Sequence, residues 1–232
     1  MSRTNEYGQP IGDLVDWTPR PQVEPVTLIG RTVRLEPWSH AHRDALYDAT
    51  VVRSPASLWT YLATPPLDEP AGLAAWLDGL AADPSAVPLV ICRPDGRGVG
   101  TASYLRLDHT NGSVEVGAIA LAAELQRTTA ATEAMFVMMK HAFDDLGYRR
   151  YEWKCDSLNG PSRSAAERFG FRYEGTFRNA VVYKGRNRDT DWLSITDAEW
   201  PAVRSAFEVW LDPGNFDDAG EQRSALRDAR PR

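Results

Sequence analysis

Residues 87–121 contain three short apolar segments separated by two turn-rich stretches, and this pattern constrains the fold more than any other part of the chain. The segments span residues 87–92, 98–107 and 113–121, with PDGRG and DHTNG between them. Short apolar runs joined by Gly-, Asp- and Asn-rich turns are typical of an antiparallel meander. The period then changes, because apolar residues recur at helical spacing over residues 129–146, up to Gly147. The sequence therefore predicts a sheet with a helix packed against it.

The rest of the chain alternates between the same two kinds of pattern. Period-2 alternation predicts strands at residues 32–37, 150–155, 173–183 and 192–196. Helical spacing predicts helices at residues 40–50, 70–82, 161–169 and 201–211. The order is strand, two helices, three strands, helix, strand, helix, two strands and helix. We therefore expect an α/β protein, with a mixed α+β sheet and helices on its faces.

The two ends of the chain differ in composition from the body, which we place at residues 31–211. Residues 1–30 contain four prolines among charged residues, which predicts an arm rather than a helix or a central strand. We expect the arm to pack on the domain through its apolar side chains, which are Tyr7, Ile11, Leu14, Val15 and Trp17. Residues 212–232 combine Pro, Gly and many charges, which predicts a polar, loosely held tail.

The composition excludes several classes of function. The 232 residues carry 26 Lys and Arg against 32 Asp and Glu, and a net charge of -6 does not favour nucleic acid as a partner. No apolar run approaches the roughly 20 residues of a membrane helix, and no secretory signal opens the chain, so we expect no membrane association and a cytoplasmic location. Cys92 and Cys155 lie far apart without clustered Cys or His, so we expect no disulfide scaffold and no metal site.

The segment at residues 124–133, ELQRTTAATE, carries the strongest chemical signal. It lies between a predicted strand and a predicted amphipathic helix, and it consists mainly of small and hydroxyl-bearing residues. The free N–H groups of a first helical turn, with the positive end of the helix dipole behind them, bind phosphate well, and small side chains allow close approach. The alternative is a plain helix start with Thr128 or Thr129 as the N-cap. From this segment alone the alternative is favoured.

The chain resembles the GNAT superfamily of acyl-CoA-dependent N-acyltransferases, and more closely its RimJ/RimL-type branch, over about residues 28–200. The resemblance is carried by LQRTTAATEA (125–134), by the block at residues 142–178, and by the N-x-x-S and GFRYEG signatures within that block. It implies a mostly antiparallel, splayed central sheet flanked by helices. It also implies an acetyl-CoA-dependent N-acetyltransferase that transfers the acyl group directly from the thioester to a primary amine in a ternary complex.

The resemblance further implies where coenzyme A binds. In the family a Q/R-x-x-G-x-G/A loop cradles the pyrophosphate, and Gln126, Thr129 and Ala131 stand at the matching positions, with Thr129 where Gly is usual. The pantetheine arm is expected between the strand that ends at 119–121 and the strand that diverges after Trp153. The expected cofactor-binding residues are Ile119, Ala120, Leu121, Gln126, Arg127, Thr128, Thr129, Ala130, Ala131, Thr132, Asn159 and Ser162. For Asn159, a helix-start or turn role is the equal alternative.

Two residues are candidates for catalysis. Glu115 is the candidate base, because a carboxylate within an apolar strand near the reaction centre would have a raised pKa. The alternative is a solvent-facing strand residue. Many GNAT enzymes use a Tyr to protonate the thiolate, but Ala166 stands at about that place, so Ser162 is the candidate substitute. A structural role at the start of a helix is the alternative for Ser162.

The acceptor pocket is the least specified part of the predicted site. Trp38, Trp59 and Tyr61 are candidates for substrate binding because loops at these positions help to form the acceptor groove in the family, although aromatic residues more often pack. The acceptor is a protein N-terminus or a small-molecule amine, and the acidic balance of the chain suits a cationic one. The donor is acetyl-CoA, with succinyl or longer acyl groups as alternatives.

Three further interpretations remain open. The run GRNRDTDW at residues 185–192, with Asp156 and Arg163, is dense in polar residues near the expected site, but a charge-rich hairpin turn is the favoured explanation. A noncatalytic acyl-CoA-binding sensor, or an interaction protein built on the same scaffold, is the alternative function. A homodimer is expected from the family alone.

Overall fold

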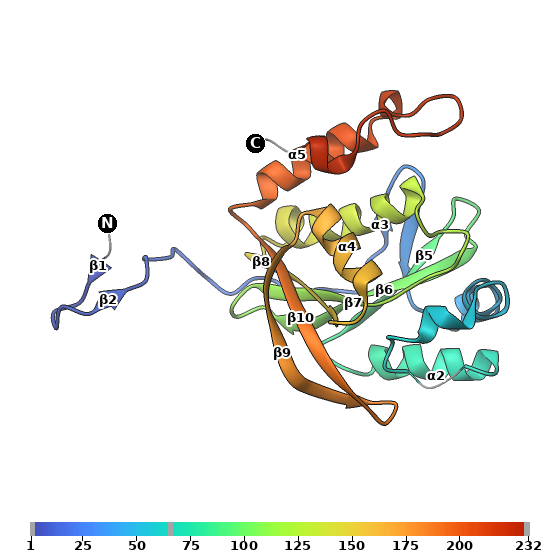
Figure 1. Cartoon of the computed structure of the whole chain (residues 1–232), viewed down its shortest axis with the longest axis horizontal. Helices are drawn as coiled ribbons and strands as arrows, with labels where there is room; N and C mark the ends of the chain where they lie inside the picture. Colours follow the sequence, from blue (N-terminus) through green and yellow to red (C-terminus); the bar gives the residue numbers. More distant parts are fainter. Residues whose placement is uncertain (1–2, 65–66, 230–232) are drawn as a thin grey trace.

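The structure of the protein is a computed structural model that describes residues 3–64 and 67–229. Within these residues, eight strands form one sheet in the order β3-β4-β5-β6-β7-β8-β10-β9 (Figure 1). The strands are β3 (Leu28–Ile29), β4 (Arg34–Pro37), β5 (Val87–Cys92), β6 (Gly98–Asp108), β7 (Ser113–Leu121), β8 (Arg150–Asp156), β9 (Arg172–Tyr183) and β10 (Arg186–Thr196). Neighbouring strands are antiparallel except for β7 and β8, which are parallel.

Helices cover both faces of the sheet. They are α1 (Arg43–Tyr47), α2 (Pro70–Ala81), α3 (Thr129–Lys140), α4 (Gly160–Phe169) and α5 (Trp200–Leu211). The larger core cluster lies under α3, α4 and α5, and a smaller one lies under α1 and α2 on the opposite face (Figure 1). β5 is apolar throughout because Leu89 and Ile91 enter the larger cluster while Val90 and Cys92 enter the smaller one. None of the described helices is long and apolar enough to cross a membrane.

The structure confirms the predicted α/β class with a mixed sheet, and the meander formed by β5, β6 and β7 has the predicted order. Two strands differ from the prediction. The short β3, which pairs with β4, was not predicted, because two residues are too few to show a period. β10 begins at Arg186 instead of residue 192, because pairing with β9 rather than burial makes its polar first half a strand.

The predicted helix at residues 40–50 is the least regular of the helical segments. A short 3₁₀ turn at His40–His42 precedes α1, and a π turn at Asp48–Val52 follows it. A similar π turn, His141–Asp145, completes α3 before Gly147, which has a positive φ of 68°. Helix α4 ends as predicted at Gly170, whose φ of 109° is favoured only for glycine.

The two parallel strands in the middle of the sheet diverge part of the way along. β7 and β8 are paired only from Ser113 opposite Arg150 to Val116 opposite Trp153. A bulge in β7 follows directly, with Ala118 at a φ of 50° and its carbonyl oxygen bonded by Thr101 Oγ1. Beyond this point β7 pairs only with β6, and β8 pairs only with β10. Among the described strands, none pairs with the facing edges of residues 117–121 and 154–156. Two carbonyls there have other partners, since that of Leu121 accepts from the Gln126 side chain and that of Asp156 from Asn159 N.

The N-terminal arm differs from the prediction. Its first part, residues 3–16, extends away from the domain as a small hairpin of β1 (Arg3–Thr4) and β2 (Pro10–Ile11) (Figure 1). Its predicted anchors are exposed, and they are Tyr7, Ile11, Leu14 and Val15. Packing begins at Trp17, whose indole N–H donates to the Thr110 carbonyl at 2.7 Å. The prediction that the arm packs on the domain is therefore wrong for residues 3–16, because residues 3–11 bond within their own hairpin and the side chains of Leu14 and Val15 face solvent.

The C-terminal segment also differs from the predicted loose tail. Leu226 is 1% exposed and joins the larger core cluster. Asn215 holds the segment together, since its amide accepts from Ser224 N and donates to the Trp210 carbonyl. The Trp210 indole donates to Gln222. The prediction missed this packing because isolated apolar residues in a polar run have no period. Residues 1–2 of the predicted arm and 230–232 of the predicted tail lie outside the described residues.

Candidate active site

The gap between β7 and β8 provides two unpaired backbone edges, to which an extended ligand with amide groups could add as a strand does. The predicted residues Ile119, Ala120 and Leu121 lie on the β7 edge. Ile119 and Leu121 are half-buried against the larger core cluster, whereas Ala120 is fully buried in the smaller one. These three residues therefore offer their backbone to the gap.

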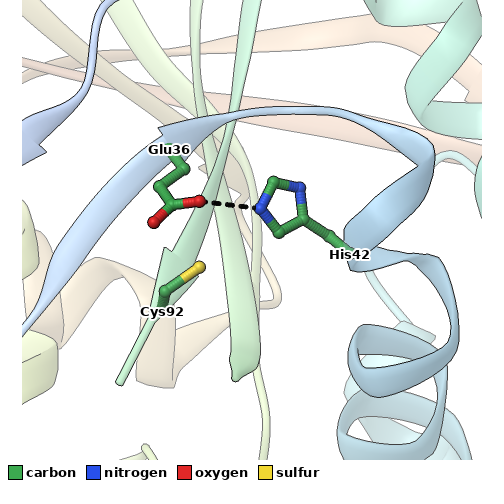
Figure 2. Close-up of side chains that lie close together, drawn as sticks. All are labelled: Glu36, His42 and Cys92. Carbon is green, nitrogen blue, oxygen red and sulfur yellow. Dashed lines mark hydrogen bonds and ion pairs between the residues drawn. The ribbon is translucent and has the colours of Figure 1, made fainter. Parts of the chain in front are cut away.

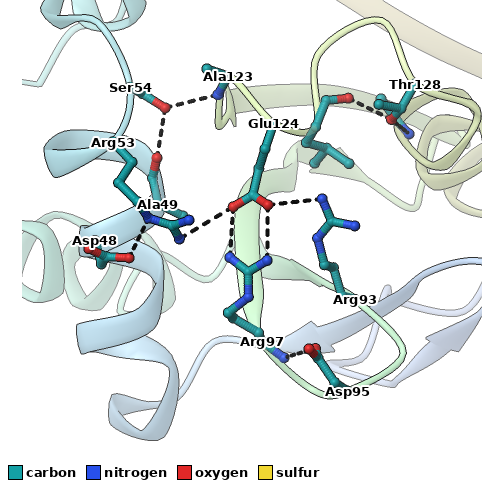
Figure 3. A network of polar contacts seen from close by, with 12 residues as sticks. Asp48, Ala49, Arg53, Ser54, Arg93, Asp95, Arg97, Ala123, Glu124 and Thr128 are labelled. Atoms are coloured by element: carbon teal, nitrogen blue, oxygen red, sulfur yellow. Dashed lines mark hydrogen bonds and ion pairs between the residues drawn. The ribbon is translucent and has the colours of Figure 1, made fainter.

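The loop that follows β7 is held by a hub of charges around Glu124 (Figure 3). The Glu124 carboxylate accepts two hydrogen bonds from Arg97, at 2.7 and 2.9 Å, and one from Arg93 at 2.9 Å. Arg53 lies 3.3 Å from the same carboxylate. These hydrogen bonds, above all those from Arg97, lower the pKa of Glu124 to about 2. Sequence reasoning had Glu124 within the loop but gave it no role, since its partners come from distant segments.

A second anchor fixes the same loop. Ser54 Oγ accepts from the Ala123 N–H at 2.9 Å and donates to the Ala49 carbonyl at 2.7 Å. The Gln126 side chain bonds back to the Leu121 carbonyl at 2.8 Å, so this predicted ligand residue shapes the loop with its own amide. The loop is therefore positioned before any ligand arrives.

The loop ends in an open N-terminus of α3. Thr128 is the N-cap, and its hydroxyl accepts from Ala131 N and donates to the Leu125 carbonyl. Thr132 N is bonded to the Thr128 carbonyl. In the described chain, the N–H groups of Arg127, Thr129 and Ala130 have no acceptor. Arg127 has a φ of 61°, which turns the chain into the helix. Both interpretations of the segment are thus compatible, because the N-cap leaves three N–H groups for an anion.

Two of the predicted loop residues have structural roles instead. Ala131 and Thr132 are buried, at 6% and 4% exposed. The Thr132 hydroxyl accepts from Arg168 of α4 at 3.1 Å. Their side chains therefore fix α3 on the core and are not available to a ligand.

The start of α4 brings Asn159 and Ser162 to the end of β8. Asn159 is the N-cap, and its side-chain oxygen accepts from Ser162 N at 3.2 Å. Ser162 Oγ accepts from the Trp153 indole at 3.0 Å, and Trp153 is the last β8 residue paired with β7. Ser162 is also next to Cys155. Burial raises the pKa of the Cys155 thiol, and the hydrogen bond with the Ser162 hydroxyl lowers it by a smaller amount. Both residues therefore lie at the mouth of the gap while also capping a helix.

Glu115 has a different environment from the apolar one expected. Its carboxylate is 2.6 Å from Arg106 and 3.0 Å from Lys154. Lys154 also pairs with Glu152 at 2.8 Å, and its ammonium lies 3.7 Å from the centre of the Trp192 ring. Glu115 is thus buried, but it is neutralised by two cations in the paired part of β7. Both cations contact the same carboxylate oxygen, Oε2.

A second carboxylate, which sequence reasoning noted but did not select, lies at the gap itself. Asp156 is the last residue of β8 and is 4% exposed. Its carboxylate accepts from Leu158 N at 2.9 Å and from the Tyr183 hydroxyl at 2.7 Å. Burial and the hydrogen bond to Asp156 raise the pKa of Tyr183 to about 12, so the phenol is protonated at neutral pH. Tyr183 is half-buried, so it connects the buried carboxylate to the surface.

Segment 59–61 and the β9–β10 hairpin meet at the same place. The Tyr61 hydroxyl donates to the Leu158 carbonyl at 3.2 Å. Lys184, at the tip of the hairpin, donates to the Trp59 carbonyl at 2.6 Å. Tyr61, Asp156 and Tyr183 therefore come from three separate segments and meet beside the end of β8. In the sequence, the polar run at residues 185–192 was the one indication that polar segments meet here.

The two predicted substrate-binding tryptophans lie elsewhere. Trp59 is 8% exposed, packs edge-on against Trp76, and donates its indole N–H to the Thr50 carbonyl. Trp38 donates to Asp78 of α2 at 2.8 Å and packs against the smaller core cluster. Both side chains are therefore core or helix-packing residues, because indoles bury large apolar areas. Of the three candidates, Tyr61 alone has its side chain near the gap.

Glu36, His42 and Cys92 form a cluster whose ligand atoms lie within 4.8 Å of one another (Figure 2). His42 Nε2 is 3.0 Å from Glu36, and its Nδ1 is 3.2 Å from Ser39 Oγ. The second Glu36 oxygen is 2.7 Å from Arg34. Burial, with Glu36 nearby, raises the pKa of the Cys92 thiol to about 12. The imidazole and carboxylate are thus already bonded and the thiol is protonated, so the cluster is a hydrogen-bonded link between β4 and the start of α1.

Comparisons with known proteins agree with this geometry. Residues 32–172 match the model of the family described as Acetyltransferase (GNAT) domain. The chain belongs to the GNAT acetyltransferases. The general activity of this family is the acetyl-CoA-dependent acetylation of amines.

Several relatives define the likeness further. The chain is similar to a GCN5-related N-acetyltransferase from Brucella melitensis, with 45% identity, a TM-score of 0.89, and coverage of 93% of this chain and 98% of that one. It is also similar to a probable acetyltransferase of the GNAT family from Chromobacterium violaceum ATCC 12472, with 36% identity, a TM-score of 0.78, and coverage of 84% and 98%.

A sequence relative is the Bacillus subtilis (strain 168) protein named "Putative ribosomal N-acetyltransferase YdaF", 30% identical over 106 residues. The match covers 46% of this chain and 57% of that protein, so the chain spans little more than half the length of this curated relative.

Proposed function

We propose that the protein is an acetyl-CoA-dependent N-acetyltransferase that acts on a primary amine, either a protein N-terminus or a small molecule. The observation that carries the proposal is the continuity of two features. The unpaired edge of β7 leads directly into an anchored loop and three acceptor-free N–H groups at the start of α3. A ligand with amides at one end and a pyrophosphate at the other matches that arrangement.

The donor side of the proposal rests on this chain's own residues. The edge of residues 117–121 would bond the pantetheine amides, and the N–H groups of Arg127, Thr129 and Ala130 would hold the pyrophosphate. Asn159 and Ser162 would contact the donor from the other side of the gap. The fold also occurs in Mycobacterium smegmatis RimJ with CoA-disulfide and in Vibrio cholerae spermidine N-acetyltransferase with CoA and spermine. Thr129 in place of the usual glycine lies at the first helical position and keeps its N–H available.

The chemistry requires a proton acceptor for the amine and a proton donor for the thiolate. Acetyl-CoA supplies the activated acetyl group, so the new bond joins the amine nitrogen to the acetyl carbon while the carbon–sulfur bond breaks. The Tyr183 hydroxyl would take the amine proton as it passes its own to Asp156, over the 2.7 Å bond that joins them. We assign the base to Asp156 because its carboxylate lies at the gap, whereas that of Glu115 is paired with Arg106 and Lys154.

Ser162 is the proposed donor to the sulfur. Because the Trp153 indole already donates to Ser162 Oγ, the hydroxyl proton can point toward a sulfur, either that of the neighbouring Cys155 or that of a bound thiolate. The same indole bond polarises the hydroxyl and favours proton donation. The role in helix capping belongs to Asn159 and the Ser162 N–H, so it does not compete with the hydroxyl.

A two-part experiment tests the proposal. Calorimetry should first show saturable binding of acetyl-CoA and of desulfo-CoA to the purified protein. Release of free thiol is then measured with a peptide bearing a free N-terminal amine, the same peptide N-acetylated as the control, and a polyamine. Thiol release that needs a free amine supports the enzyme. Binding without release from any amine would identify an acyl-CoA sensor, and no binding would identify a scaffold.

A further inference from the structure

Within residues 3–64 and 67–229, two apolar surfaces have no partner, and the first is the arm. Tyr7 and Leu14 are 78% and 86% exposed, and Ile11 and Val15 are about half exposed or more. The hairpin is nevertheless ordered, because Asn5 Oδ1 accepts from both Tyr7 N and Gln9 N. A preformed segment loses little conformational entropy when it binds. Large apolar side chains held outward on such a segment are typical of a contact surface.

The second surface is β9, the outermost strand of the sheet. β9 pairs only with β10, and its other edge is open over twelve residues. Phe177 is 55%, Val181 40% and Val182 79% exposed along it. A long, exposed apolar edge strand invites pairing with another chain unless something covers it. Within the described residues, no other strand or helix pairs with this edge (Figure 1).

The two surfaces have opposite charge. The arm at residues 3–16 carries one basic residue, Arg3, and three acidic ones, which are Glu6, Asp13 and Asp16. Residues 172–196, which form β9 and β10, carry three acidic residues, Glu174, Asp189 and Asp191, and five basic ones, which are Arg172, Arg178, Lys184, Arg186 and Arg188. Complementary charge steers two surfaces together and fixes their orientation.

We infer that the arm of one copy of this chain lies along β9 of a second copy, and that the exchange is reciprocal in a two-fold dimer. A second copy fits because the same chain carries both surfaces. In a two-fold dimer, the two arms then cover the two β9 strands, so that all four surfaces are buried. The arm leaves its own domain at Trp17 and points away from it (Figure 1). It can therefore reach a neighbouring copy. This inference does not depend on the proposed enzymatic activity.

The first test measures mass in solution. The full chain should sediment as a dimer at micromolar concentration. Leu14→Asp on the arm and Val182→Asp on β9 should each raise the dimer dissociation constant about tenfold or more, because each buries an unpaired charge in the contact. Val209→Asp is the matched control, since Val209 is 57% exposed on α5, outside both surfaces. A monomeric full chain, or a dimer that both variants leave unchanged, overturns the inference.

A disulfide test separates exchange between copies from docking within one copy. The native Cys92 and Cys155 are buried, so they give little background. Copies with Leu14→Cys are mixed with copies of different mass that carry Val182→Cys, and the mixture is oxidised. The expected product is a disulfide between unlike copies. If instead a chain carrying both substitutions closes an internal disulfide and the mixture forms no mixed product, the arm docks on its own chain and the inference is wrong.

Discussion

Replacing Thr129 with proline removes one N–H from the proposed pyrophosphate site and changes little else. Thr129 is the first residue of α3, a position where proline is favoured because its missing N–H has no partner in the helix. The preceding residue, Thr128, is extended at a φ of −95° and a ψ of 162°, which is the conformation that proline requires before it. We therefore expect the free energy of unfolding to change by less than about 0.5 kcal/mol.

The effect on the donor should be much larger. A hydrogen bond to a charged group contributes about 1.5–3 kcal/mol, which corresponds to a loss of about 10- to 100-fold in affinity. Thr129→Pro should thus raise the Kd for acetyl-CoA by that factor in calorimetry. Thr129→Ala is the control, because it removes the hydroxyl but keeps the N–H, and it should bind within about twofold of the parent. Equal binding by the proline variant, with an unchanged melting temperature, would refute the assignment of this N–H.

Three further predictions concern the other residues. Glu124→Gln should lower the free energy of unfolding at pH 7 by about 1–2 kcal/mol, because its hub is partly exposed. The pKa of Glu124 is held at about 2 instead of 4.5, so this contribution is present above about pH 4.5 and is lost as the pH falls toward 2. In urea unfolding, the difference in free energy of unfolding between the parent and the variant should therefore be smaller at pH 2.5 than at pH 7. An equal difference at the two pH values contradicts the prediction. Asp156→Asn should lower kcat by about 100-fold or more with little change in acetyl-CoA affinity, whereas Glu115→Gln should lower kcat less; the reverse order would return the base to Glu115. Ser162→Ala should lower kcat while leaving the melting temperature within a few degrees, and the deficit should shrink with a thioester whose thiol is more acidic; an unchanged kcat would leave Ser162 a purely structural residue.

The elements of this fold were largely predictable because their signals are local. The meander at 87–121 and the helix from Thr129 follow from period and turn residues, and the structure has them at nearly those bounds. The predicted cap at Thr128 or Thr129 is also local, since a cap bonds within three residues of itself. The irregular helix around α1 was not predictable in this way, because helical spacing of apolar residues does not distinguish a π turn from an α-helix.

The roles of side chains were predicted less well. Trp38 and Trp59 have the residue type expected of an acceptor pocket, but the structure places both in packing contacts. Asp156 and Tyr183 are separated by 27 residues, and they meet only because β8 and β9 both pair with β10. Spacing along the chain carries no signal for such a pair.

The sequence by itself determined the class of the fold, the order of most of its strands and helices, and the segment that begins α3, because periodicity, turns and caps act over a few neighbouring residues. The tertiary structure decided which carboxylate bonds Tyr183, which charges hold Glu124, and that residues 3–16 leave the domain. These outcomes depend on which distant segments lie next to each other. Burial and ion pairing between such segments change what a side chain can do without changing the local pattern around it.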